Sequence, residues 1–163
     1  MGNGCRKQNT NVYFQARKEA AEKNDRLSSR EGASELLGVS ESTLADYELG
    51  NTKVVPVDKV VLMADLYRCP ELKNRYCKCE CPIGKALPIA TEAKGIEGIT
   101  IQFLNEFNVR KVADLRERLL DIAKDGVVDA SERSALQCIG GWASDMEYTL
   151  NQLRLTISKI MGD

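Results

Sequence analysis

The sequence contains no histidine and carries almost no net charge. Its 23 lysine and arginine residues are balanced by 24 aspartate and glutamate residues, so the overall charge does not indicate nucleic-acid binding. Without imidazole, the commonest acid–base group of enzymes and the commonest metal ligand are both missing. The sequence also has no glycine loop that would cradle a phosphate and no nucleophile with a recognisable base beside it. We therefore expect the protein not to be an enzyme.

Long apolar runs are also absent. No stretch approaches the roughly 20 apolar residues that span a bilayer, and the N-terminal segment MGNGCRKQNT has no apolar core behind its basic residues, as a secretory signal would. We expect a cytoplasmic protein without a membrane partner. Its six cysteines are then better interpreted as reduced thiols or metal ligands than as disulfides.

Alternation of apolar and polar residues, the pattern of strands, is missing from the N-terminal half, which indicates an all-α fold. Ser29 and Ser40 are suited to cap the starts of helices, and Gly38 stands where the glycine that ends a helix is expected. These signals divide residues 11–76 into five short helices. We predict helices over residues 12–24, 29–37, 40–50 and 56–67, and a fifth turn or two that begins at Pro70.

The span 29–50, SREGASELLGVSESTLADYELG, has a distinctive order of residues. A small residue, Ser34, lies where two helices would touch, Gly38 makes the turn, and Val39 follows it as a core residue. This span resembles the helix-turn-helix of the Xre and phage-lambda-repressor-like transcriptional regulators, and the resemblance covers approximately residues 11–76. It implies a five-helix DNA-binding domain. The side chains assigned to its core are Leu37, Leu44 and Tyr47.

The resemblance also implies which side chains would meet DNA. Phosphate contacts in this family come largely from the start of the helix before the turn and from the loop after the recognition helix, and both places carry cations here. The recognition helix itself is acidic and hydroxyl-rich; carboxylates can accept from cytosine N4, and serine can pair with several base edges. We expect modest affinity, a shallow salt dependence and reliance on dimerisation. The predicted DNA-binding residues are Arg26, Arg30, Glu41, Ser42, Thr43, Asp46 and Lys53.

The pattern changes beyond residue 98. Two long helices are predicted over residues 99–124 and 130–161, and the short connection between them should fold them into an antiparallel hairpin. The second helix repeats apolar residues at alternating intervals of three and four, which is the spacing of a heptad seam. Because two helices cannot cover both flanks of such a seam, we predict that residues 99–163 pack on a second copy as a homodimer. The seam consists of Leu136, Ile139, Ala143, Met146, Leu150, Leu153, Ile157 and Ile160.

A glycine pair, Gly140 and Gly141, lies inside this second helix. Glycine weakens a helix interior, unless close packing or a kink requires it.

A cysteine-containing linker, residues 77–98, separates the two halves. Four thiols within a short stretch could form a thiolate-rich zinc or iron–sulfur site, although the C-x-C-x-C spacing lacks the wider gaps of zinc knuckles. A buried structural cluster or partly exposed thiols are the alternatives. The segment also resembles one that follows the helix-turn-helix in Firmicute and prophage Xre-like regulators. The candidate metal ligands are Cys69, Cys77, Cys79 and Cys81.

A calcium-loop pattern runs from Asp121 to Glu132, but Ala123 occupies a place where an oxygen ligand is needed. The local alternative is that Asp129 caps the last helix with Glu132 as its partner, and that Gly126 ends the preceding helix.

The sequence therefore favours a sequence-specific, dimeric, DNA-binding transcriptional regulator of the Xre type that binds double-stranded DNA. Two alternatives remain open. One is an interaction protein in which the helical hairpin carries the function and DNA binding is vestigial. The other is a variant of the regulator that senses thiol oxidation or metal. The resemblance fits a prophage or other mobile-element setting.

Overall fold

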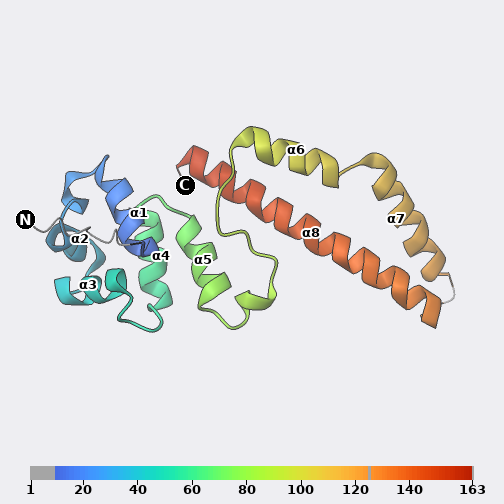
Figure 1. Ribbon diagram of the computed structural model, residues 1–163, viewed down its shortest axis with the longest axis horizontal. Coiled ribbons are helices and arrows are strands. Elements are labelled where there is room, and N and C mark those ends of the chain that lie inside the picture. The colour runs from blue at the N-terminus through green and yellow to red at the C-terminus, as the bar shows by residue number, and fades with distance from the viewer. Residues whose placement is uncertain (1–9, 125, 163) are drawn as a thin grey trace, which may run out of the picture.

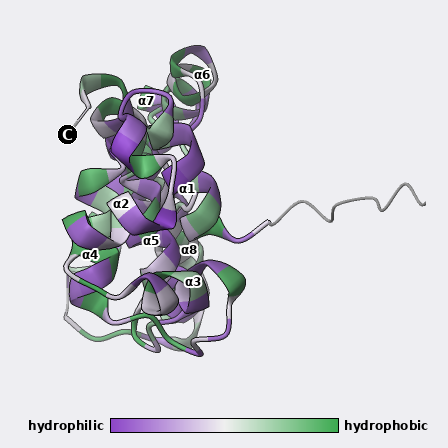
Figure 2. Cartoon of the chain, turned by 90° about the vertical axis from the view of Figure 1, so that its left-hand side faces the viewer, coloured by the Kyte–Doolittle hydropathy of each residue, from purple (hydrophilic) through white to green (hydrophobic). Residues whose placement is uncertain are grey.

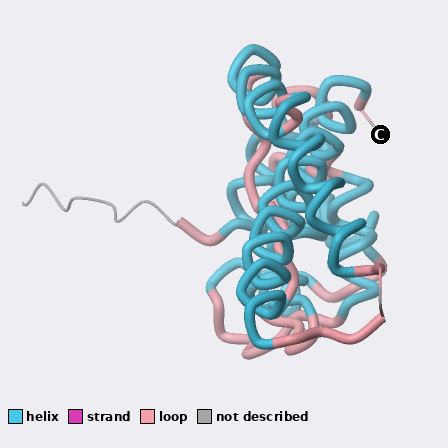
Figure 3. Tube along the Cα trace, turned by 90° about the vertical axis from the view of Figure 1, so that its right-hand side faces the viewer, coloured by secondary structure: helices cyan, strands magenta, loops and turns pink. Residues whose placement is uncertain are grey.

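The computed structural model describes residues 10–124 and 126–162. Helices and loops make up all of that described part (Figure 3), which confirms the prediction of an all-helical chain. The short helices α1–α5 gather at one end of the molecule, and α6, α7 and α8 extend away from them (Figure 1). The elements are α1 (Val12–Ala21), η1 (Asp25–Leu27), α2 (Arg30–Leu37), α3 (Glu41–Leu49), α4 (Val57–Leu66), α5 (Glu71–Cys79), η2 (Gly84–Ala86), α6 (Ile96–Glu106), α7 (Val109–Ile122) and α8 (Ala130–Met161).

Helices α1–α5 form the N-terminal module, which encloses an apolar core. Leu44 and Met63 are completely buried, and Leu37 and Tyr47 are buried beside them, so the three side chains predicted for the core lie in it. Figure 2 shows hydrophobic and hydrophilic residues interleaved along α2, α3 and α4. Each helix thus has one face for the core and one for solvent.

The module extends further along the chain than residues 11–76. Helix α5 continues through Cys79, into the segment predicted as a linker. Glu80 then accepts hydrogen bonds from the Tyr13 hydroxyl, at 2.8 Å, and from the Val55 backbone N–H, at 3.1 Å. The helix predicted to run to Asn24 is shorter than expected, because Asn24 instead caps η1 by accepting from the Arg26 N–H.

The single helix predicted over residues 99–124 is wrong. The structure has two helices there, α6 and α7, and the chain breaks between them at Phe107 and Asn108. The Asn108 side chain accepts from the backbone N–H groups of Arg110 and Lys111, so it starts a new helix instead of continuing the old one. Both helices contact α8, and the predicted two-helix hairpin is therefore a three-helix arrangement (Figure 1).

Polar contacts join the C-terminal part of α8 to the N-terminal module. The Asn151 side-chain oxygen accepts from the Asn74 side chain at 3.1 Å and from the Ala90 N–H at 2.9 Å. Near the end of α8, Lys159 Nζ lies 2.6 Å from Glu71 Oε1. The N-terminal module is thus attached at the C-terminal end of α8.

Candidate nucleic-acid interface

The α2–α3 unit is shaped by its caps. Ser29 accepts from the Gly32 N–H at the start of α2, and Ser40 accepts from the Thr43 N–H at the start of α3. Gly38 ends α2 with a φ of 61°, a left-handed conformation that glycine adopts without steric cost. A Cβ at Gly32 would overlap the carbonyl of the chain entering α2, so this glycine is required by close backbone approach.

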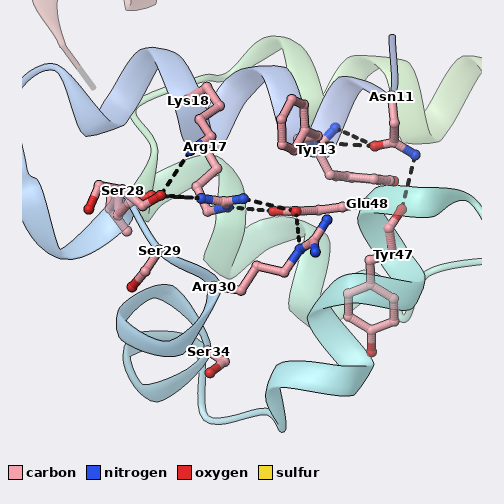
Figure 4. Close-up of polar contacts among 12 residues, drawn as sticks. Asn11, Tyr13, Arg17, Lys18, Ser28, Ser29, Arg30, Ser34, Tyr47 and Glu48 are labelled. Atoms are coloured by element: carbon pink, nitrogen blue, oxygen red, sulfur yellow. Dashed lines mark hydrogen bonds and ion pairs between the residues drawn. The ribbon is translucent and has the colours of Figure 1, made fainter. Parts of the chain in front are cut away.

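A buried ion cluster holds α3 against α1 and α2 (Figure 4). Glu48 on α3 is fully buried, and both its oxygens accept from the Arg17 guanidinium on α1, with Nη2 at 2.9 Å from Oε2. Arg30, the first residue of α2, donates its Nε to the same Oε2 at 2.8 Å. Glu48 is therefore neutralised inside the protein. Of the three acids on α3, only two face solvent.

Arg17 also fixes the entry to α2. Its Nη1 donates to the backbone carbonyls of Leu27 and Ser28, at 2.9 and 3.2 Å. Lys18 Nζ donates to the same Ser28 carbonyl at 2.8 Å, which places an exposed cation beside the start of α2 (Figure 4). Lys18 was not predicted as a site residue, because no spacing rule connects a residue of α1 to a turn ten positions later.

The side chains predicted to contact bases lie on the open face of α3. Glu41, Ser42 and Asp46 are exposed, whereas Thr43 is half-buried. The Thr43 hydroxyl lies 2.7 Å from the Ser40 Oγ, and the Ser42 hydroxyl lies 2.9 Å from the same atom. The first turn of α3 therefore presents a small group of linked hydroxyls beside the Glu41 carboxylate.

Asp46 is held in place by the turn that follows α3. The Asn51 side chain donates to Asp46 Oδ1 at 3.0 Å, and the Asn51 N–H donates to the Asp46 carbonyl at the same distance. Asn51 was not predicted as a site residue, although its position directly after Gly50 made it a turn residue. Its contact gives the Asp46 carboxylate a defined orientation.

The three predicted phosphate-binding cations lie in different surroundings. Arg30 is 32% exposed and contacts Glu48, so it also has a structural task. Arg26, in η1, forms an exposed ion pair with Glu35 at 3.1 Å. Lys53 is exposed in the turn after α3. The structure thus ties Arg30 directly to α3 and places the other two cations on either side of the α2–α3 unit in sequence.

The four candidate metal ligands are distributed over α5 and its flanks. The Cys69 thiol is 3.5 Å from Glu71 Oε2, and burial, together with this carboxylate, raises its pKa to about 12. Cys77 and Cys79 are two positions apart on α5, so their side chains leave opposite sides of the helix. Among residues 10–124 and 126–162, no group of three or more Cys, Asp or Glu side chains is arranged to hold a metal ion. A zinc or iron–sulfur site stays a prediction.

The residues of the calcium-loop pattern make other contacts. Asp129 caps α8 by accepting from the Ser131 and Glu132 N–H groups, and the Glu132 carboxylate accepts from the Asp129 N–H, which confirms the predicted capping box. These contacts, the Glu132 N–H first, lower the pKa of Asp129. Asp121 pairs with Lys124 at 2.6 Å. Asp125 lies outside the described residues, and α7 ends at Ile122 rather than directly before Gly126.

Comparison with known proteins adds no relative: no family model matches the chain, and neither a curated protein nor a solved structure matches it. In the described part of the chain, no helix combines the length and the apolar character needed to cross a bilayer.

Proposed function

We propose that the protein is a dimeric, sequence-specific DNA-binding regulator of transcription, of the Xre type, in which α3 enters the major groove. The observation that supports this most is the division of α3 into two faces. Leu44, Tyr47 and Glu48 are buried against the module, while Glu41 and Asp46 are exposed with Ser42 between them. An exposed helix face that ends in short polar side chains is suited to contact base edges.

The charges around α3 fit this proposal. The buried Arg17 and the half-buried Arg30 guanidinium groups neutralise Glu48, so that carboxylate adds little repulsion toward phosphates. The two exposed acids still lower the attraction to DNA, which supports a shallow salt dependence. Exposed cations before α2 and after α3, at Lys18 and Lys53, would hold the backbone while the α3 side chains discriminate between bases.

Dimerisation is the second part of the proposal. Leu150, Ile157 and Ile160, three members of the predicted seam on α8, are 41%, 47% and 64% exposed. A solvated apolar stripe along one long helix is typical of a surface that another chain covers. Two modules joined through α8 could then bind two half-sites of a palindromic operator.

Selection of bound fragments from random genomic DNA, followed by sequencing, tests the proposal. We expect a palindromic motif. Ser42→Ala should relax the preference at one base-pair position and cost about 1–3 kcal/mol there. Lys53→Glu should weaken binding to all sequences alike and reduce the salt slope by about 1 or more. Reversal of Lys124, an exposed cation at the far end of α7, should leave binding unchanged and serves as the control.

Arg30 is unsuitable for charge reversal, because a carboxylate there would face the buried Glu48. Enrichment of no motif by the unaltered protein would contradict DNA readout. It would favour an interaction protein, in which the C-terminal helices carry the function.

A further inference from the structure

Helix α8 buries several polar side chains, while part of its apolar seam stays exposed. Thr149, Gln152 and Thr156 are each no more than 2% exposed, and they pack against the protein's own chain. Thr149 accepts from the Gln102 side chain of α6 at 2.9 Å, and Thr156 hydrogen-bonds to the backbone of Lys94. Polar side chains thus supply much of the intramolecular packing of this helix. Of its heptad seam, Met146 is buried, whereas Leu150, Ile157 and Ile160 are exposed.

The seam itself forms a shallow apolar groove along α8. The groove is lined by residues of α8 alone, over the stretch 142–157. No other described element of the chain lines it. Its main apolar side chains are Trp142, Ala143, Met146, Leu150, Leu153 and Ile157.

One acid and one base lie along the same groove. Glu147 and Arg154 are both exposed and line it, about two helical turns apart. Within residues 10–124 and 126–162, none of the ion pairs involves either side chain. The edge of the groove thus carries a positive and a negative charge on either side of Leu150.

Two small residues of α8 precede Leu150 at positions that mirror two large ones after it, although Trp142 and Met146 also precede Leu150. Gly140 and Ala143 precede it, and a Cβ added at Gly140 would meet no atom within 4 Å in the protein's own chain. Each glycine inside a helix costs about 1 kcal/mol relative to alanine, so the packing of the single chain does not explain this one. Large side chains follow Leu150 on the same face: Ile157 is 47% exposed and Met161 is 70% exposed.

We propose that a second copy of this chain docks on the groove with its α8 antiparallel, about a two-fold axis near Leu150. An antiparallel pair brings together residues at equal distances from the axis. With the axis midway between Leu150 and Asn151, Glu147 of one protomer lies at the level of Arg154 of the other, and Gly140 lies at the level of Met161. Ala143 then lies within one residue of the level of Ile157. Charge and size are both complementary in this one register, and the symmetry repeats each pair on the other side of the axis.

A parallel pair lacks this match. It places each layer of the seam beside its own copy, so that glycines lie near glycines and large side chains near large ones. In a parallel pair Glu147 and Arg154 would each lie level with their own copies, seven positions from the residue of opposite charge, so no opposite charges would meet.

This dimer geometry extends the proposed function, and its biological role rests on that function. Lys159 and Glu71 attach the N-terminal module near the C-terminal end of α8. In the antiparallel pair these ends point away from each other, and the two α3 helices lie at opposite ends of the assembly.

Exchange of the charges at Glu147 and Arg154 tests the antiparallel register. Sedimentation in the absence of DNA measures the self-association of each variant. Glu147→Arg and Arg154→Glu should each weaken self-association about tenfold or more, because each creates two like-charge pairs per dimer. Mixing the two single variants in equal amounts should restore association to the level of the unaltered protein, since every mixed pair is again opposite in charge. The variant with both exchanges should also self-associate.

Asp145→Lys is the matched control, because Asp145 is exposed on α8 outside the groove and its reversal should not change association. Circular dichroism melts check that every variant stays folded. A monomeric unaltered protein at tens of micromolar, single variants that associate normally, or a mixture that fails to recover would each overturn the proposal. Intact pairing without a selected DNA motif would reject the DNA-binding function and leave this interface standing.

Discussion

The two ends of the molecule differ in how completely they bury their apolar side chains and pair their charged ones. In the N-terminal module, Leu44 is 0% exposed and the charged Glu48 is equally buried with two arginine partners. On α8, in contrast, Leu150 is 41% exposed although its spacing marks it as a core residue. The first region is closed within one chain, whereas the second leaves part of an apolar face exposed to solvent. Similar hydrophobic patterning thus has different meanings in the two regions.

The largest effect should come from the ion cluster in the closed region. Glu48→Gln leaves the buried Arg17 without its counter-charge, and loss of one partner of a buried pair costs about 3–5 kcal/mol. Urea unfolding followed by circular dichroism measures this loss. Glu35→Gln, which breaks the exposed pair with Arg26, should cost less than about 1 kcal/mol.

A double variant sharpens this test. Arg17→Met combined with Glu48→Leu removes both buried charges, and such replacements are close to neutral when the packing is kept. We expect it to recover most of the stability lost by Glu48→Gln. A double variant as unstable as the single one would show that packing, and not an unpaired charge, determines the loss.

Truncation of two leucines compares the regions directly. Leu44→Ala creates a cavity in a closed core and should lower the free energy of unfolding by about 2–5 kcal/mol. Leu150→Ala should lower it by less than about 1 kcal/mol in dilute solution, because the side chain is already largely solvated. Denaturant titration at low protein concentration gives both values. Equal losses would contradict the distinction between a closed and an open region.

The Asn108 cap at the break between α6 and α7 should make a smaller contribution to the free energy of unfolding. Asn108→Ala removes the side chain that caps α7 and should cost about 1 kcal/mol. Asn105→Ala, at an exposed position inside α6, is the control and should be neutral or slightly stabilising because alanine is the better helix former. Thermal melts of the two variants distinguish these outcomes.

The effect that is smallest at neutral pH, and that grows only under alkaline conditions, concerns Cys69. Burial raises the Cys69 pKa from 9.0 to about 12, so above pH 9 the unfolded chain releases this proton while the folded chain keeps it. Stability should therefore fall between pH 9 and pH 12, and Cys69→Ala should reduce the slope. Thiol labelling provides a second check: the exposed Cys79 and Cys138 should react before Cys69.

Local signals in the sequence predicted the local structure well. Ser29, Ser40 and Asp129 cap helices in the positions expected from their spacing, and Gly38 adopts the predicted left-handed turn. Each of these features depends on residues within one turn of one another, which sequence patterns describe directly. The exposure of Glu41, Ser42 and Asp46 follows from the same periodicity, since the core residues of α3 occupy its other face.

Contacts between distant residues could not be predicted in this way. The Arg17–Glu48 pair joins α1 to α3, and the position of neither residue in the sequence identifies its partner. The helix break at Asn108 was missed because apolar spacing continued on both sides of it, while the capping hydrogen bonds decided the outcome. The cysteines are closely spaced in the sequence, but the geometry of α5 directs Cys77 and Cys79 to different sides of the helix.

The attachment of the N-terminal module to α8 has a mechanical consequence. Asn151 binds both Asn74 and the Ala90 backbone, and Lys159 binds Glu71, so the connection resists swivelling at several points along the helix. In the proposed regulator, a module held this firmly would not adjust to an operator whose halves are poorly spaced. The duplex itself would have to bend or twist to contact both α3 helices. The stiffness of base pairs that the protein never touches would then contribute to its choice of target.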